Sequence, residues 1–184
     1  MSGSPAGPLV VAGIDPGLAR TGYGVVAIQG RTGRLLASGT IVTRAHMPAH
    51  RRLLELYRQL QDVLAEWRPP LVVVERLFLG RNRTSAMAVG EARGVAMLAA
   101  AQAGARIVEL TPQQVKLMMT GAGRGEKSQV GYMVRALLHV QAPLGPDEAD
   151  ALAVALCGAW MEAEGTAPGG CSAWPAREEA SGGP

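Results

Sequence analysis

Residues 9–17 read LVVAGIDPG and residues 71–75 read LVVVE, and these two stretches decide the fold. Each is an apolar run that meets an acid at its end, Asp15 or Glu75, and the first stops at an Asp-Pro-Gly turn. Apolar, β-branched runs of this length predict buried strands. If the two strands are parallel neighbours, both carboxylates face one cleft, because ligand sites in such sheets gather beyond the carboxyl ends of the strands.

The segments around these two runs predict the order of strands and helices. Strands are expected at 9–14, 21–29, 34–43, 71–74 and 106–110, and helices at 50–67, 84–103, 111–120, 127–140 and 147–161. Three strands followed by alternating helices and strands indicate an α/β domain, a mixed five-stranded sheet flanked by helices, because right-handed crossovers place the later strands parallel to the first. The ribonuclease-H-like fold uses this order.

The composition predicts one folded domain with two loose ends. A chain of 184 residues with 48% hydrophobic content can bury a single core. Residues 1–8 and 165–184 are rich in Gly, Pro, Ala and Ser, a composition that buries little surface. We therefore expect a flexible N-terminus at 1–8, one working domain at 9–161 and a disordered C-terminal tail at 162–184.

Charge and cysteine content indicate where the protein acts and what it binds. No apolar run reaches the roughly 20 residues of a membrane span, and no basic region precedes Asp15 as in a secretion signal. Cys157 and Cys171 lack disulfide or metal-type spacing, so a cytoplasmic location is expected. The net charge of +3 includes an acidic tail, so the domain is more basic than the total. Such a domain is suited to nucleic acid, although a merely solvated surface explains the charge equally well.

Two more acids begin the last predicted helix. Asp147 and Asp150 are three residues apart and share a helix face, which can point into the same cleft as Asp15 and Glu75. Four carboxylates without His or Cys suit Mg²⁺ or Mn²⁺, and two such ions about 3.5 to 4 Å apart can hydrolyse a phosphodiester. Simpler roles stay open for each acid. Asp15 can simply form the Asp-Pro-Gly turn, and Glu75 can form a salt bridge with a neighbouring Arg. Asp147 and Asp150 can simply be favoured by the positive end of the helix dipole.

Four blocks of the sequence resemble one known family, the RuvC Holliday-junction resolvases. They are GIDPGLARTGYGVV (13–26), VVVERLFLGRNRTSAMAVGEARGVA (72–96), TPQQVKLMMTGAGRGEKSQV (111–130) and PDEADALAVAL (146–156). The blocks follow the family's order and cover most of the domain. The resemblance implies a metal-dependent endodeoxyribonuclease that acts as a homodimer, resolves four-way DNA junctions by paired symmetric nicks in recombination and repair, and works with the branch-migration proteins RuvA and RuvB.

The resemblance also implies roles for individual residues. The family's metal-binding acids fall on Asp15, Glu75, Asp147 and Asp150, of which the third is Asp in some members and His in others. Its basic phosphate contacts fall on Lys116 and Lys127. The sequence departs from the family where Arg76 replaces a familiar Gln and Gly125 a usual Ala, and these changes concern local DNA contacts and sequence preference.

A polar and basic segment follows Glu75. Phe78 can stack on an unpaired base at the crossover while Arg81 and Arg83 hold phosphates, or its ring can fold back on the core. Further on, Gly90 and Gly94 lie one turn apart on an Ala-rich helix, where they permit close approach to the sheet or to a second subunit.

Three other functions are alternatives to the nuclease. Residues 121–128 look somewhat like a phosphate-binding loop, but Glu126 intrudes and a helix precedes them where that loop needs a strand. Asp15-Pro-Gly with Thr21-Gly22 resembles the phosphate loop of actin-like kinases, which usually need a second copy of the domain. A non-catalytic junction binder is the third alternative. Mutation of Asp150 separates them, since only a nuclease should lose cleavage while keeping binding.

Overall fold

The computed structural model describes residues 7–76, 83–121 and 126–166, apart from the side chains of 83–85. Along the chain the elements are β1 (Leu9–Asp15), β2 (Arg20–Gln29), β3 (Thr32–Val42), α1 (Ala49–Trp67), β4 (Leu71–Glu75), α2 (Arg83–Gln102), β5 (Arg106–Leu110), α3 (Pro112–Thr120), α4 (Lys127–Leu137) and α5 (Pro146–Ala163). The predicted order of strands and helices is confirmed throughout these ranges.

The five strands form one mixed sheet in the order β3-β2-β1-β4-β5. The first three strands pair antiparallel, while β1, β4 and β5 are parallel neighbours. In the β1–β4 register Ile14 lies opposite Val74, so Asp15 and Glu75 follow at the same level. The parallel arrangement needed for one shared cleft is therefore present.

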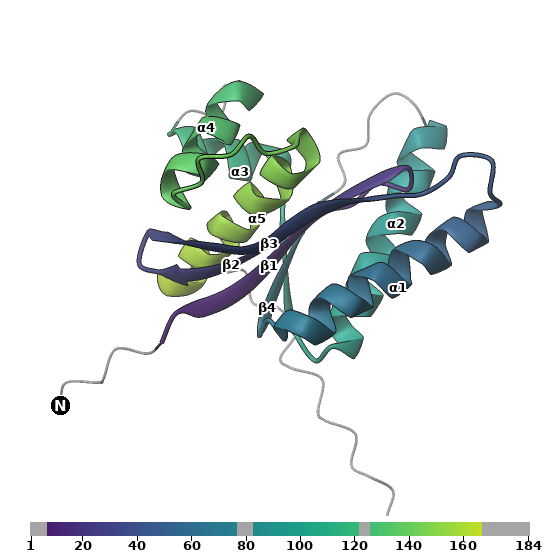
Figure 1. Ribbon diagram of the computed structural model, residues 1–184, viewed down its shortest axis with the longest axis horizontal. Helices are drawn as coiled ribbons and strands as arrows, with labels where there is room; N and C mark the ends of the chain where they lie inside the picture. Colours follow the sequence, from purple (N-terminus) through teal and green to yellow (C-terminus); the bar gives the residue numbers. More distant parts are fainter. Residues whose placement is uncertain (1–6, 77–82, 122–125, 167–184) are drawn as a thin grey trace, which may run out of the picture.

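Helices cover both faces of this sheet. Figure 1 shows α1 and α2 on one side and α3, α4 and α5 on the other. Each side has its own hydrophobic core, one built with residues of α1 and α2 and the other with residues of α3, α4 and α5. The central strands are therefore buried on both faces, which explains why β1 and β4 are continuous apolar runs rather than alternating ones.

The alternation of side chains along a strand decides which face the acids occupy. In β4, Val72 and Val74 pack in the core with α1 and α2, whereas Leu71 and Val73 pack in the core with α5. Because successive side chains point to opposite faces, Glu75 belongs with Leu71 and Val73. The same counting from Val11 places Asp15 on the face that α5 covers.

Helix α5 lies unusually close to the sheet because glycines line its path. A Cβ at Gly13 would lie 2.1 Å from the carbonyl oxygen of Ala151, and a Cβ at Gly22 would lie 2.1 Å from that of Asp147. Any side chain at these strand positions would push the helix away. Ten consecutive residues of α5, from Ala151 to Trp160, are buried, so this helix forms the centre of its layer.

Two helix ends differ from the predicted ones by two residues or more. Helix α4 was predicted to reach Val140 but ends at Leu137, because His139 adopts a left-handed backbone with φ 54° that cannot continue a helix. Helix α5 continues two residues beyond the predicted end, to Ala163. The start of α3 is as predicted, with Thr111 as N-cap in a capping box with Gln114.

The expectations for the chain ends fall largely outside the described part. Strand β1 begins at Leu9, where the working domain was expected to begin. Residues 1–6 and 167–184, on which flexibility and disorder were expected, are not described. Among the helices within the described ranges, none has the length and apolar character needed to cross a membrane.

Candidate active site

Asp15 and Glu75 form the centre of the candidate site. Their carboxyl groups are hydrogen-bonded to each other, so one of them carries a proton. The pKa of Glu75 is raised to about 8, first by burial and then by the charge of Asp15, by their hydrogen bond and by Asp150. Burial also raises the pKa of Asp15, against the lowering effect of the hydrogen bond from Glu75. The strand ends thus hold two carboxyl groups in a setting where both charges together are costly.

The two acids of α5 are each paired with a cation from another element. Arg20, at the start of β2, donates from Nε to Oδ2 of Asp147 at 2.7 Å. Lys127, at the start of α4, donates from Nζ to Oδ2 of Asp150 at 2.9 Å. The side chains of Asp147 and Asp150 are 23% and 27% exposed, so both acids are half-buried at the edge of the site. Thr40 also contacts Oδ2 of Asp147, at 3.5 Å.

The electrostatics link three of the four acids. The charge of Asp150 raises the pKa of both Asp15 and Glu75, and the charge of Lys127 lowers the pKa of both. The hydrogen bond to Asp150, followed by the charge of that group, raises the pKa of Lys127. Asp147 acts on Asp15 as the weakest of its neighbours. The structure therefore brings Asp15, Glu75 and Asp150 together with Lys127, and places Asp147 farther out beside Arg20.

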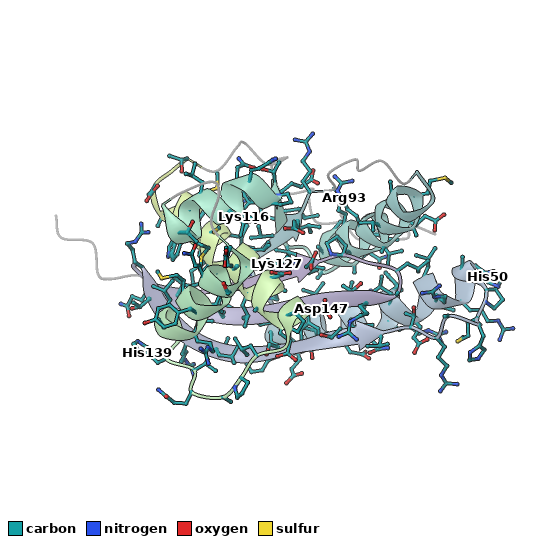
Figure 2. All side chains as sticks on the ribbon, turned by 90° about the horizontal axis from the view of Figure 1, so that it is seen from above. His50, Arg93, Lys116, Lys127, His139 and Asp147 are labelled. Atoms are coloured by element: carbon teal, nitrogen blue, oxygen red, sulfur yellow. The ribbon has the colours of Figure 1, made fainter. Side chains whose placement is uncertain are left out.

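The donor set fits a hard divalent cation. All four groups are carboxylates, the ligands that Mg²⁺ and Mn²⁺ prefer. In Figure 2 the labelled His50 and His139 lie at opposite ends of the molecule, away from Asp147, so neither adds a nitrogen ligand there. Within the described residues no three His, Cys, Asp or Glu side chains are arranged to hold an ion between them. In this conformation Asp147 and Asp150 are instead directed to Arg20 and Lys127.

The Asp-Pro-Gly turn after β1 is fixed by Thr21. The fully buried Thr21 donates from Oγ1 to the carbonyl oxygen of Gly17 at 2.7 Å and accepts from the amide of Gly17 at 3.2 Å. This hydroxyl therefore closes the turn and is not available to a nucleotide phosphate. The phosphate-loop interpretation of residues 15–22 loses its main polar side chain, which weakens the kinase alternative.

The loop after α3 does not match a nucleotide-binding loop either. It joins α3 to α4, whereas that loop requires a strand before it. Glu126, the residue that spoils the spacing, is the N-cap of α4 and forms a capping box with Gln129. Glu126 therefore has a structural role at the start of α4. The next residue, Lys127, contacts Asp150. Residues 122–125 lie outside the described residues. They include Gly125, which stands where the family usually has Ala.

The predicted DNA contacts are only partly described. Lys116 lies on α3, on the side of the sheet that carries α5 (Figure 1). Phe78 and Arg81 fall in the segment 77–82, outside the described residues, and Arg83 begins α2 with its side chain undescribed. Contacts of these three residues with DNA stay predictions.

Two residues that position the site were missed by sequence reasoning. Gly22 pairs with Asp15 across the β1–β2 ladder and allows the backbone of Asp147 to lie against it. Arg20 holds the side chain of Asp147. A signal for Gly22 was present, because glycine inside a strand marks close approach of another backbone. Nothing in the sequence pairs Arg20 with a residue 127 positions away.

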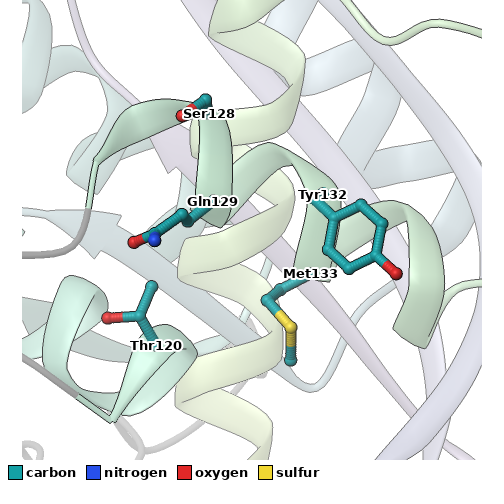
Figure 3. Close-up of a pocket in the computed structure, with 5 residues that line it drawn as sticks. All are labelled: Thr120, Ser128, Gln129, Tyr132 and Met133. Carbon is teal, nitrogen blue, oxygen red and sulfur yellow. The ribbon is translucent and has the colours of Figure 1, made fainter.

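A separate hollow of about 390 Å³ lies between the end of α3 and α4. Figure 3 shows the five residues that line it, Thr120, Ser128, Gln129, Tyr132 and Met133. Among the described residues that line this hollow there is none of the four carboxylates, and Ser128 is the neighbour of Lys127. The chemistry suggested by the acids therefore does not depend on it.

Comparison with known proteins identifies the family. The family model described as crossover junction endodeoxyribonuclease RuvC matches residues 11–158. The protein of that name from Heliobacterium modesticaldum is 48% identical over 150 residues, which cover 81% of this chain and 93% of the relative. The one from Thermomicrobium roseum is 46% identical over 148 residues, covering 80% of this chain and 90% of the relative.

Solved structures agree with the sequence relatives. The structure described as Thermus thermophilus RuvC in complex with Holliday junction substrate superposes with a TM-score of 0.83 at 39% identity, covering 86% of this chain and 98% of that one. The yeast mitochondrial resolvase Ydc2 shares the fold alone, with a TM-score of 0.59 at 12% identity, covering 89% of this chain and 83% of that one. The ribonuclease-H-like fold expected from the element order is thus confirmed, and the chain belongs to the RuvC family of crossover junction endodeoxyribonucleases.

Proposed function

We propose that this protein resolves four-way DNA junctions by a pair of symmetric nicks, in homologous recombination and DNA repair. One observation carries the proposal: two acids at the ends of adjacent parallel strands lie on the sheet face covered by α5, and the N-terminal part of this helix supplies Asp147 and Asp150. Family membership, and the junction named in the description of the Thermus thermophilus relative, support the choice of substrate.

The cofactor that we propose is Mg²⁺, two ions at each active site, with Mn²⁺ as a substitute. Asp15, Glu75, Asp147 and Asp150 would hold them. When bound, the ions activate a water molecule and stabilise the leaving oxygen of the phosphodiester. The chain itself has to release the proton shared by Asp15 and Glu75, so that both carboxylates can act as ligands. We infer attack by water without a covalent enzyme intermediate, with inversion at phosphorus and 5′-phosphate and 3′-hydroxyl products.

Basic residues beside the acids are proposed to hold the DNA backbone. Lys127 lies at the site itself, and its exposed side chain can reach a phosphate next to the scissile bond. Lys116 extends this positive charge along α3. Phe78, Arg81 and Arg83 are proposed to contact the crossover, on the family resemblance alone.

A homodimer is proposed because a two-fold assembly presents two equal sites to equivalent strands. Helix α2 offers a surface for it. Met87 and Leu98 are 69% and 52% exposed on this helix. A Cβ at Gly90 or Gly94, which share their face, would meet nothing within 4 Å. These glycines do not approach the sheet, which leaves a second subunit as the explanation that we adopt.

Two further expectations complete the proposal. RuvA and RuvB, the branch-migration proteins of the family, are proposed as partners. The cytoplasm is the proposed location, because Cys157 is a buried free thiol whose pKa burial raises to about 12, an inert side chain suited to a reducing compartment.

Cleavage of a synthetic junction tests the function directly. The purified chain is incubated with an end-labelled four-way junction or a matching linear duplex, with Mg²⁺, Mn²⁺ or a chelator. We expect symmetric nicks in the junction alone that require metal. An Asp150→Asn variant should bind the junction but not cleave it, while the matched Asp62→Asn variant on the exposed face of α1 should cleave normally.

The other outcomes separate the alternatives. Cleavage of every substrate would keep the nuclease and discard junction selectivity. Binding without cleavage by the unaltered chain under both metals would favour the non-catalytic binder. Retention of configuration at phosphorus, or a trapped protein–DNA adduct, would contradict direct attack by water.

A further inference from the structure

The four acids of the site form two pairs with different partners. Asp15 and Glu75, at the ends of adjacent parallel strands, contact each other. Asp147 and Asp150, on α5, are held by guanidinium and ammonium groups at 2.7 Å and 2.9 Å. These two cations come from β2 and α4, elements other than the helix that carries the acids, so the pairs are a product of the tertiary fold and not of helix spacing.

The exposed fractions of the side chains show that the acid of each pair is more buried than its cation. The acids are 23% and 27% exposed, whereas the side chains of Arg20 and Lys127 are 55% and 77% exposed. The carboxylates belong to the buried edge of the site, and the cations reach over them from solvent. Each cation can therefore leave its carboxylate by a side-chain rotation, without movement of a strand or helix.

The pairs also explain why the acids do not form a ready ion site. A carboxylate oxygen that accepts a bond from a cation at 2.7 to 2.9 Å cannot ligate a metal through the same lone pair. Asp147 and Asp150 each use Oδ2 in this way, and within the ranges 7–76, 83–121 and 126–166 no three ligand side chains are gathered for an ion. A divalent ion that takes Oδ2 of either acid therefore competes with the cation paired to it.

We propose that Arg20 and Lys127 are internal counter-cations that compete with the divalent ion for Asp147 and Asp150 and are released to DNA phosphates when the metal binds. The proposal rests on the proposed metal-dependent function. It gives Arg20 a positioning role, and it gives Lys127 a role in the DNA-free protein that differs from a phosphate contact. In the metal-free chain the two cations stay paired with Asp147 and Asp150. Metal and DNA then bind cooperatively, because the cations that the metal displaces can pair with DNA phosphates.

Metal affinity of the DNA-free protein tests the proposal. Mn²⁺ is titrated into the full chain, its Arg20→Gln variant and its Lys127→Gln variant, and binding is followed by calorimetry and by the electron paramagnetic resonance of free Mn²⁺. Each variant should bind Mn²⁺ about two- to fivefold more tightly, the range expected for loss of a partly exposed ion pair. Arg20→Lys and Lys127→Arg should stay close to the unaltered chain, because the charge is kept.

A control separates the ion pairs from net charge. Arg76 is exposed, directly follows Glu75 and makes no ion pair with any described residue. Arg76→Gln should leave the affinity nearly unchanged. Equal tightening in Arg76→Gln would show a general charge effect and overturn the proposal, as would unchanged or weaker Mn²⁺ binding in both test variants.

The result is distinguishable from failure of the proposed function. Junction cleavage by the unaltered chain tests the function and does not depend on these affinities. If the chain cleaves junctions but the two variants bind Mn²⁺ no more tightly, only the counter-cation proposal fails. If neither the chain nor the variants bind Mn²⁺ and the chain also leaves junctions uncleaved, both proposals fail.

Discussion

Gly22 lies against the backbone of Asp147, at a distance that leaves no room for a side chain. A Cβ at Gly22 would be 2.1 Å from the carbonyl oxygen of Asp147 and 2.7 Å from its carbonyl carbon. Gly22 is also the ladder partner of Asp15. A single glycine thus sets the separation between the sheet acids and the first turn of α5, and this contact yields the first prediction.

Gly22→Ala should move the start of α5 away from Asp15 and Glu75. Backbone contacts of this kind cannot be relieved by a side-chain rotation, so we expect at least a tenfold loss of junction cleavage, weaker Mn²⁺ binding and a lower midpoint of thermal unfolding. Gly131→Ala on α4 is the control, because nothing lies within 4 Å of a Cβ there. It should keep activity and gain up to about 1 kcal/mol of stability. Normal cleavage by Gly22→Ala would contradict the positional role.

The stability of the metal-free protein should fall as the pH rises. The pKa of Glu75 is about 8 in the folded chain against an ordinary 4.5, so the folded state holds a proton that the unfolded state loses. The stabilisation from this group is complete below pH 4.5 and is lost as the pH rises through about 8, and Asp15 acts in the same direction. Thermal unfolding in chelator should show a midpoint that declines across this window.

Two comparisons check that Glu75 causes the decline. Glu75→Gln should flatten the dependence on pH, and Glu66→Gln, on the exposed face of α1, should leave it unchanged. Added Mg²⁺ should raise the midpoint more at pH 8.5 than at pH 5.5, because deprotonated carboxylates bind the ion. An unchanged midpoint between those two pH values in chelator would count against the shared proton.

Helix α3 should depend on its N-cap. Thr111 accepts from the amide of Gln114 through its hydroxyl, while the side chain of Gln114 accepts from the amide of Thr111. Thr111→Ala removes one half of this box and should cost about 1 kcal/mol in the free energy of unfolding, measured with denaturant. Thr111→Ser keeps the hydroxyl and should lose much less. Equal losses would mean that the methyl group, and not the cap, matters.

The exposed face of α2 should control the oligomeric state. Met87→Glu and Leu98→Glu place charges on a surface that we propose to be covered by the second subunit. We expect monomers in sedimentation velocity and loss of paired nicking. Tyr132→Glu, which is 64% exposed on α4, should remain dimeric. If the α2 variants sediment as the unaltered chain does, the interface lies elsewhere.

Much of the fold was predictable because strong local signals agreed with one another. The apolar runs that end at Asp15 and Glu75 predicted strands, and Pro112 after Thr111 predicted the start of α3. The element order then left a mixed sheet as the simplest arrangement. The exception was the end of α4, where an apolar pattern continued past His139 while the backbone did not. Hydrophobic periodicity does not report a left-handed residue.

The sequence by itself determined which residues can carry chemistry: four acids, two of them at strand ends and two near the start of a helix, with a lysine at the start of another helix. Only the tertiary structure decided how these groups are neutralised. The packing of glycines in β1 and β2 against α5 brings Asp147 beside Arg20 and Asp150 beside Lys127. Such pairings depend on distances between elements more than 20 residues apart in the chain. Local propensity cannot encode those distances, because they are set by how closely two backbones can approach.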